Sequence, residues 1–137
     1  MTDAVKKLFV QYEKAFNALD VEKQVPLFAE HFISAGPRGS IPQGRDEFAR
    51  MASKAAEFYR SAGQTSAKIL SMEETAISRE YSMVKVHWGA TFEKTGDKLI
   101  EFDVTYFIRN TDTEPKIIMF IAHQDEEKAM KELGLLG

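Results

Sequence analysis

The sequence predicts an α+β fold, with three N-terminal helices followed by a curved antiparallel sheet of four main strands. Up to Ala62, apolar side chains recur at spacings of three and four, which is the period of an amphipathic helix. From Thr65 onward, four segments rich in β-branched and aromatic residues are separated by short turn sequences, which favours antiparallel hairpins. Because helices precede strands in this order, the helices are expected to pack on one face of the sheet.

The first two helices are expected over residues 3–19 and from Val21 to about His31. The first carries one apolar stripe: Val5, Leu8, Phe9, Tyr12, Phe16 and Leu19. Asp20 separates the two, because its carboxylate can accept hydrogen bonds from the amides that follow. Pro26 fits only the first turn of a helix, so a break is expected near residues 23–25.

The remaining elements follow from turn signals. A short extended piece (32–35) leads into a loop, GPRGSIPQG, and a third helix over 45–62 is expected to end at Gly63. The four strands are predicted over these ranges: 65–77, 81–94, 99–110 and 116–124. A short charged helix is expected over 125–135.

Composition narrows the function classes. The chain of 137 residues fits one domain, 1–137, and has a net charge of −3, so no basic surface for nucleic acid is expected. It has no cysteine, which excludes thiol catalysis. No apolar run is long enough for a membrane span, and the charged N-terminus does not read as a signal peptide, so a cytoplasmic protein is expected.

No metal or cofactor site is predicted. His87 and His123 are expected on the outer face of the sheet. His87 has no His or acidic residue two positions away, and the acidic residues that follow His123 are expected to belong to a solvated helix. The segment GPRGS lacks the Lys-Ser/Thr ending of a phosphate loop, and is expected to be a turn that leaves Arg38 available to an acidic ligand.

Three segments carry a family resemblance: YEKAFNALDVEKQVPLFAEHF, GRDEFARM and VTYFIRNTDTEPKIIMFIAH. In their order, and over nearly the whole chain, they resemble the nuclear-transport-factor-2-like superfamily, which includes SnoaL-like cyclases and ketosteroid isomerase. The resemblance implies a cone-shaped sheet whose concave face is covered by the three helices. It also implies homodimers formed sheet to sheet. Members include isomerases, dehydratases, cyclases and non-catalytic binders, so the fold alone does not assign a reaction.

Ketosteroid isomerase needs an aspartate base and two hydrogen-bond donors. The resemblance places its catalytic tyrosine at Tyr12, its base at Gly36 and its protonated aspartate at Thr105. Only the tyrosine is retained, which disfavours that mechanism.

If Thr105 faces the cone as this match implies, alternate residues of its strand, including Asp103 and Phe107, face the same way. The match also places the following residues on the inward face of the sheet: Val86, Trp88, Ala90, Phe92, Ile118, Phe120 and Ala122. It places a second set on the outward face: Phe102, Val104, Tyr106, Ile108, Ile117, Met119 and Ile121. An outer face this apolar predicts a homodimer through the convex side of the sheet.

The inward set predicts an apolar pocket with few polar groups. Its expected ligand-binding residues are Phe16, Trp88, Phe92, Thr105, Phe107 and Phe120. One hypothesis makes Asp103 a general base, with a pKa raised by aromatic surroundings, and Tyr12 a hydrogen-bond donor. The other pairs Asp103 with Arg109, Lys85 or a backbone amide and leaves Tyr12 as a core aromatic.

Three functions stay open: binding of a small hydrophobic molecule without a cofactor, a cofactor-free isomerase or lyase using Asp103 and Tyr12, and a non-catalytic dimerisation module whose cup is filled by its own side chains. The first is preferred.

Overall fold

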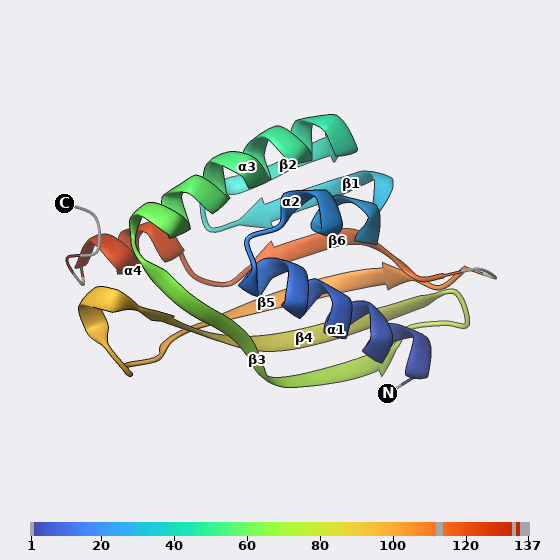
Figure 1. The fold of residues 1–137 in the computed structure, drawn as a ribbon. Helices are drawn as coiled ribbons and strands as arrows, with labels where there is room; N and C mark the ends of the chain where they lie inside the picture. Colours follow the sequence, from blue (N-terminus) through green and yellow to red (C-terminus); the bar gives the residue numbers. More distant parts are fainter. Residues whose placement is uncertain (1, 112–113, 133, 135–137) are drawn as a thin grey trace.

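The computed structural model describes residues 2–111, 114–132 and 134. In chain order the elements are α1 (Asp3–Asn17), α2 (Val21–Gln24), the 3₁₀ turn η1 (Val25–Leu27), β1 (Phe28–Gly36), β2 (Gly39–Gly44), α3 (Arg45–Ser61), β3 (Gln64–Ala76), β4 (Tyr81–Phe92), the 3₁₀ turn η2 (Glu93–Thr95), β5 (Ile100–Arg109), β6 (Lys116–Ala122) and α4 (Glu126–Glu132). The fold is α+β, as predicted (Figure 1).

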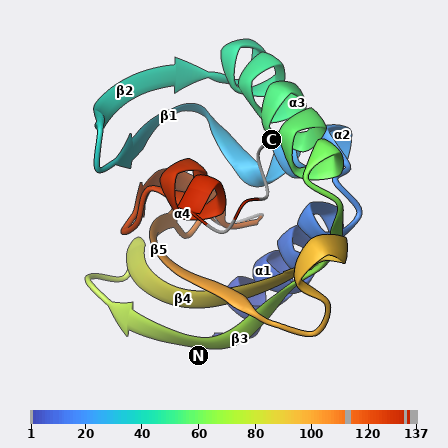
Figure 2. The same cartoon turned by 90° about the vertical axis from the view of Figure 1, so that its left-hand side faces the viewer.

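The described strands form one six-stranded sheet in the order β2-β1-β6-β5-β4-β3. Neighbouring strands are antiparallel except β1 and β6, which pair in parallel. The sheet curls strongly, so that its edge strands β2 and β3 lie on opposite sides of the opening, with α1 and α3 on the inner side (Figure 2).

The prediction of four main strands was incomplete because the segment before α3 forms a hairpin. The residues expected to continue the second helix to His31 enter β1 at Phe28 instead, directly after the proline-containing turn η1. Phe28 and Phe32 are four residues apart, and an even spacing suits one face of a strand as well as one face of a helix. The predicted loop contains β2, and Pro42 is tolerated there because β2 is an edge strand.

Helix ends follow the local signals. The side chain of Asp20 caps α2 by accepting from the Lys23 amide at 3.3 Å, as predicted. Gly63 follows α3 with a left-handed φ of 80°. Helix α4 spans Glu126–Glu132, and residues 133 and 135 of the helix predicted over 125–135 lie outside the described residues. None of the described helices is long and apolar enough to cross a membrane.

Aromatic side chains dominate the core between helices and sheet. Phe28 is fully buried, with ring centroids 4.4 Å from Phe48, 4.8 Å from Phe32 and 5.7 Å from Tyr12. These contacts join α1, β1 and α3. The hairpin missed from the sequence is therefore part of the core and not a surface addition.

Replacing Phe28 with alanine is expected to lower the free energy of unfolding by about 3–5 kcal/mol, because a buried ring is lost and a cavity is left. Urea denaturation measures the change. The matched control is Ile77→Ala, at a side chain that is 57% exposed, and its effect should stay within about 0.5 kcal/mol. Equal effects of the two substitutions would contradict the assignment of Phe28 to the core.

Candidate functional site

A cavity of about 150 Å³ lies between the helices and the inner face of the sheet. Its lining is apolar and rich in aromatic rings: Tyr12, Phe16, Leu19, Gln24, Phe48, Ala52, Ala55, Ala56, Tyr59, Trp88, Phe102, Val104, Tyr106, Phe120 and Ala122. The residues come from α1, the α1–α2 connection, α2, α3, β4, β5 and β6. Helices and sheet together therefore build the site.

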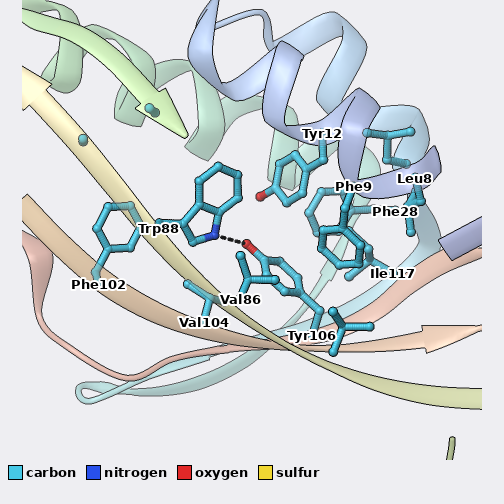
Figure 3. Packing of buried hydrophobic residues seen from close by; sticks show 14 of the residues in the cluster. Leu8, Phe9, Tyr12, Phe28, Val86, Trp88, Phe102, Val104, Tyr106 and Ile117 are labelled. Carbon is cyan, nitrogen blue, oxygen red and sulfur yellow. Dashed lines mark hydrogen bonds between the residues drawn. The ribbon is translucent and has the colours of Figure 1, made fainter. Parts of the chain in front are cut away.

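Three aromatic side chains with polar atoms meet at one wall of this cavity. The indole Nε1 of Trp88 donates to the hydroxyl of Tyr106 at 3.1 Å. The ring of Tyr12 lies edge-on to both, with centroid distances of 5.9 Å to Trp88 and 5.7 Å to Tyr106. Figure 3 shows the Tyr12 hydroxyl directed toward the other two side chains. This wall offers hydrogen-bonding atoms within an otherwise apolar surface.

Gln24 adds a buried amide to the lining. It is the last residue of α2 and is only 6% exposed. Its Nε2 lies 3.5 Å from the carbonyl oxygen of Ala15, at the outer limit of a hydrogen bond, and its Oε1 has no hydrogen-bond partner among the described residues. Because Oε1 is not fully enclosed by protein atoms, a small molecule in the cavity can reach it.

Leu19 reaches the cavity through a left-handed backbone. Its φ is 54°, which a leucine adopts only at a cost of about 1–2 kcal/mol. The turn is held by two hydrogen bonds, from the Leu19 amide to Phe16 and from the Asp20 amide to Ala15 at 2.8 Å. Glycine is the usual residue at such a helix end, but it would leave this part of the lining empty.

A second, more open groove of about 490 Å³ adjoins the cavity, since Phe120 and Ala122 line both. The groove runs between the β1–β2 turn and the end of β6. Arg38 donates to Asp125 across it at 2.9 Å, from Nε and also from a guanidinium Nη. Hydrogen bonding from the backbone of Lys128, and then Arg38, holds the pKa of Asp125 below its usual range.

Some of the residues predicted to bind a ligand meet in the cavity and others do not. Phe16, Trp88 and Phe120 line it together with Tyr12. Phe92 is buried on the same face but borders a separate space of about 70 Å³ beside α4. The predicted positions of Thr105 and Phe107 were wrong. They lie on the outer face of the sheet, opposite Lys85 and Met83 of β4.

The inward position predicted for Asp103 was also wrong. Asp103 pairs with His87 across β4 and β5, on the face away from Tyr12, so the proposed base and donor are not brought together. Its carboxylate accepts from His87 Nδ1 at 2.7 Å and from Gln124 Nε2 at 3.1 Å. The hydrogen bond with His87 lowers the pKa of Asp103, where a raised pKa was expected.

The pairing register between β4 and β5 shows that the inward and outward faces predicted for the residues of β5 were reversed. Residues opposite each other in a sheet share a face, and Trp88 and Val86, which face inward, oppose Phe102 and Val104. Five residues predicted to face outward are therefore buried inside: Phe102, Val104, Tyr106, Ile108 and Ile117. Ile117 turns inward because a bulge at Ile118 shifts the pairing of β6. Met119 and Ile121 do face outward, opposite Phe107 and Thr105.

The outer face carries a polar network centred on His87. Each ring nitrogen of His87 is hydrogen-bonded to a different carboxylate. Nε2 contacts Glu101 at 2.8 Å, and Nδ1 contacts Asp103 at 2.7 Å. Beside it, Thr105 Oγ1 is hydrogen-bonded to Nε2 of His123 at 2.7 Å. Glu101, and then Asp103, raise the pKa of His87, because the charged imidazolium can donate at both nitrogens. Within the described part of the chain, no group of three or more His, Asp or Glu side chains is placed to hold a metal ion.

Sequence reasoning missed Gln24, Phe102 and Tyr106 as lining residues. A signal for the last two was present, since the apolar residues of FDVTYFI alternate and Phe102, Val104 and Tyr106 fall on one face. Gln24 gave no such signal, because its burial depends on how α2 folds back against α1.

Comparisons with known proteins agree on the fold. A family model described as NTF2-like protein (DUF6841) matches residues 2–125. Among solved structures, an NTF2-like protein of unknown function from Shewanella oneidensis MR-1 is 18% identical with a TM-score of 0.73, covering 89% of this chain and 98% of that one. A protein of unknown function from Mycobacterium tuberculosis is 14% identical with a TM-score of 0.72, covering 89% and 74%. No curated protein matches the chain.

The His87 network predicts a defined pH dependence. The raised pKa of His87 gives stability that is present below about pH 6.5 and is lost as the pH rises through the folded-state pKa. The lowered pKa of Asp103 gives stability that is present above about pH 4 and is lost at lower pH. The network should therefore stabilise the protein most between these two limits.

NMR titration of the His87 ring protons should show a pKa above 6.5 in the unsubstituted protein. Both Glu101→Gln and Asp103→Asn should lower it, with Glu101→Gln the larger effect because that hydrogen bond is the leading cause. Asp97→Asn, at an exposed turn carboxylate, serves as the control and should leave the His87 pKa unchanged. An unshifted His87 pKa in both network variants would show that the carboxylates do not hold the ring in solution.

Proposed function

The chain belongs to the NTF2-like proteins of the DUF6841 family, and we propose that it binds a small apolar molecule in the cavity, without a cofactor. The observation that carries this proposal is the aromatic cavity of about 150 Å³ between helices and sheet. An apolar protein cavity of this volume is large enough for a benzene molecule. The proposed ligand is therefore about the size of one aromatic ring.

Binding is favoured over proton transfer by the chemistry of the lining. The described lining residues include no carboxylate and no imidazole, and their ionisable side chains are tyrosines. Asp103, the base of the isomerase or lyase alternative, lies on the other face of the sheet. A general base must reach the proton that it removes, within hydrogen-bond distance or through one water. Among the described residues, the lining offers this alternative no carboxylate or imidazole to act as the base.

The dimerisation-module alternative, with a cup filled by its own side chains, is less well supported. Two of the rings predicted to face the pocket do not fill this cavity, because Phe107 points to the outer face and Phe92 borders a different space. Trp88 and Phe120 line the cavity and leave about 150 Å³ of it unfilled.

Toluene binding tests the proposal directly, because the chain has a single tryptophan and Trp88 lines the cavity. Titration with toluene should change Trp88 fluorescence in a saturable way. Ala52→Leu should weaken binding at least tenfold by filling space, since Ala52 lines the cavity. Ser53→Leu, at the next, exposed position of α3, should leave the affinity within about twofold.

Native mass spectrometry of freshly purified protein supplies the complementary measurement, with a retained apolar molecule as the expected result. A bare mass together with no saturable response to toluene would overturn ligand binding and favour the dimerisation module.

A homodimer through the outer face of the sheet is a second proposal. One cross-strand row of apolar residues supports it: Ile33 of β1 opposes Met119 of β6, which opposes Phe107 of β5, which opposes Met83 of β4. An apolar row of this kind is a candidate interface. It is narrower than the outer face predicted from the sequence. A cytoplasmic location likewise stays a prediction.

Light scattering should give the mass of a dimer at micromolar concentration for the unsubstituted protein. Phe107→Lys should shift it to a monomer by placing a charge in the row. The control is Val10→Lys, at an apolar residue of α1 that is 56% exposed and does not belong to the sheet, and it should remain dimeric. A monomeric mass for the unsubstituted protein would refute the dimer.

A further inference from the structure

We propose that the cavity selects a small aromatic molecule that carries a hydroxyl group, and that the side-chain amide of Gln24 recognises this hydroxyl. The inference rests on the proposed function, because it names the ligand class of the same cavity. Phenol is the simplest compound of this class. Toluene has a similar shape without the hydroxyl.

The side-chain amide of Gln24 has unused hydrogen-bonding capacity where it borders the cavity. Gln24 is 6% exposed and lines the cavity, and its Oε1 has no hydrogen-bond partner among the described residues. Oε1 is not fully enclosed by protein atoms, so a hydrogen-bond donor inside the cavity can reach it. A ligand hydroxyl suits this role because it both donates and accepts.

A purely structural role explains the amide poorly. Its one contact, from Nε2 to the carbonyl oxygen of Ala15, is 3.5 Å long. That carbonyl already accepts from the backbone amide of Asp20 at 2.8 Å. The turn between α1 and α2 is therefore closed without Gln24, and an apolar side chain of the same size would suit the burial better.

The walls of the cavity favour an aromatic ring. Phe16 lies 5.2 Å from Trp88 and 6.4 Å from Tyr12, measured between ring centroids, and it meets Tyr12 at 90°. Rings arranged edge to face offer both ring edges and ring faces to a further ring between them. The described lining contains no charged group, which disfavours a carboxylate or an ammonium on the part of the ligand inside the cavity.

The test compares phenol with toluene, each titrated against Trp88 fluorescence, in the unsubstituted protein and in Gln24→Met. Methionine keeps a long unbranched side chain and removes the amide. The ratio of phenol affinity to toluene affinity should fall about three- to tenfold in Gln24→Met. Gln11→Met, at an exposed glutamine of α1, is the matched control and should leave the ratio unchanged.

The outcomes separate this inference from the proposed function. If neither compound binds the unsubstituted protein, the proposed function fails. If both bind and the ratio is the same in Gln24→Met, the cavity binds ligands but the assignment of Gln24 is overturned. A role limited to stability would weaken both compounds equally and would leave the ratio unchanged.

A measurement on the unsubstituted protein covers the case in which Gln24→Met does not fold. The side-chain amide NMR signals of Gln24 should shift on saturation with phenol and move less with toluene. Equal shifts with the two compounds, or none with phenol, would overturn the inference.

Discussion

The pairing of β4 with β5 decides which side chains meet inside the sheet and which meet outside it. Trp88 opposes Phe102, and His87 opposes Asp103, so one register sets the aromatic wall of the cavity and the charged network of the outer face together. A shift of one residue would exchange the two sets. The burial of large apolar side chains on one face fixes this register, because the exchange would bury the carboxylates and expose the rings.

The α1–α2 connection covers the cavity on the side away from the sheet, and it contributes a polar side chain, Gln24, to the lining. Helix α1 ends in a left-handed residue, Leu19, and Asp20 then starts α2 in a new direction. Pro26 follows at the point where the helix must stop. This sequence of signals brings Gln24 back against Ala15, over the cavity. The strain at Leu19 is offset by packing, since its side chain completes the lining.

Much of the fold followed from the sequence, whereas the site followed only in part. The helix stripe containing Tyr12 and Phe16 and the four later strands were predictable because their periods are long and regular. The β1–β2 hairpin was not, since Phe28 and Phe32 fit either period and Pro42 is unusual in a strand. Asp103 was misplaced because one matched position, Thr105, was given more weight than the alternating apolar residues around it. The buried position of Gln24 depends on tertiary packing, which no local pattern records.

Ionisable side chains lie on the outer face of the sheet and neutral polar groups lie inside, so the two faces have different properties. On the outer face, His87 and its carboxylates remain in contact with solvent, where ionisation costs little and responds to pH. Inside, tyrosine hydroxyls, an indole N–H and one amide supply the polarity, and none of them needs to carry a charge near neutral pH. A cavity of this kind can orient a neutral ring by hydrogen bonds without the cost of burying an ion. Under the proposed function, ligand selectivity would therefore depend on shape and on hydrogen-bond complementarity, and little on pH.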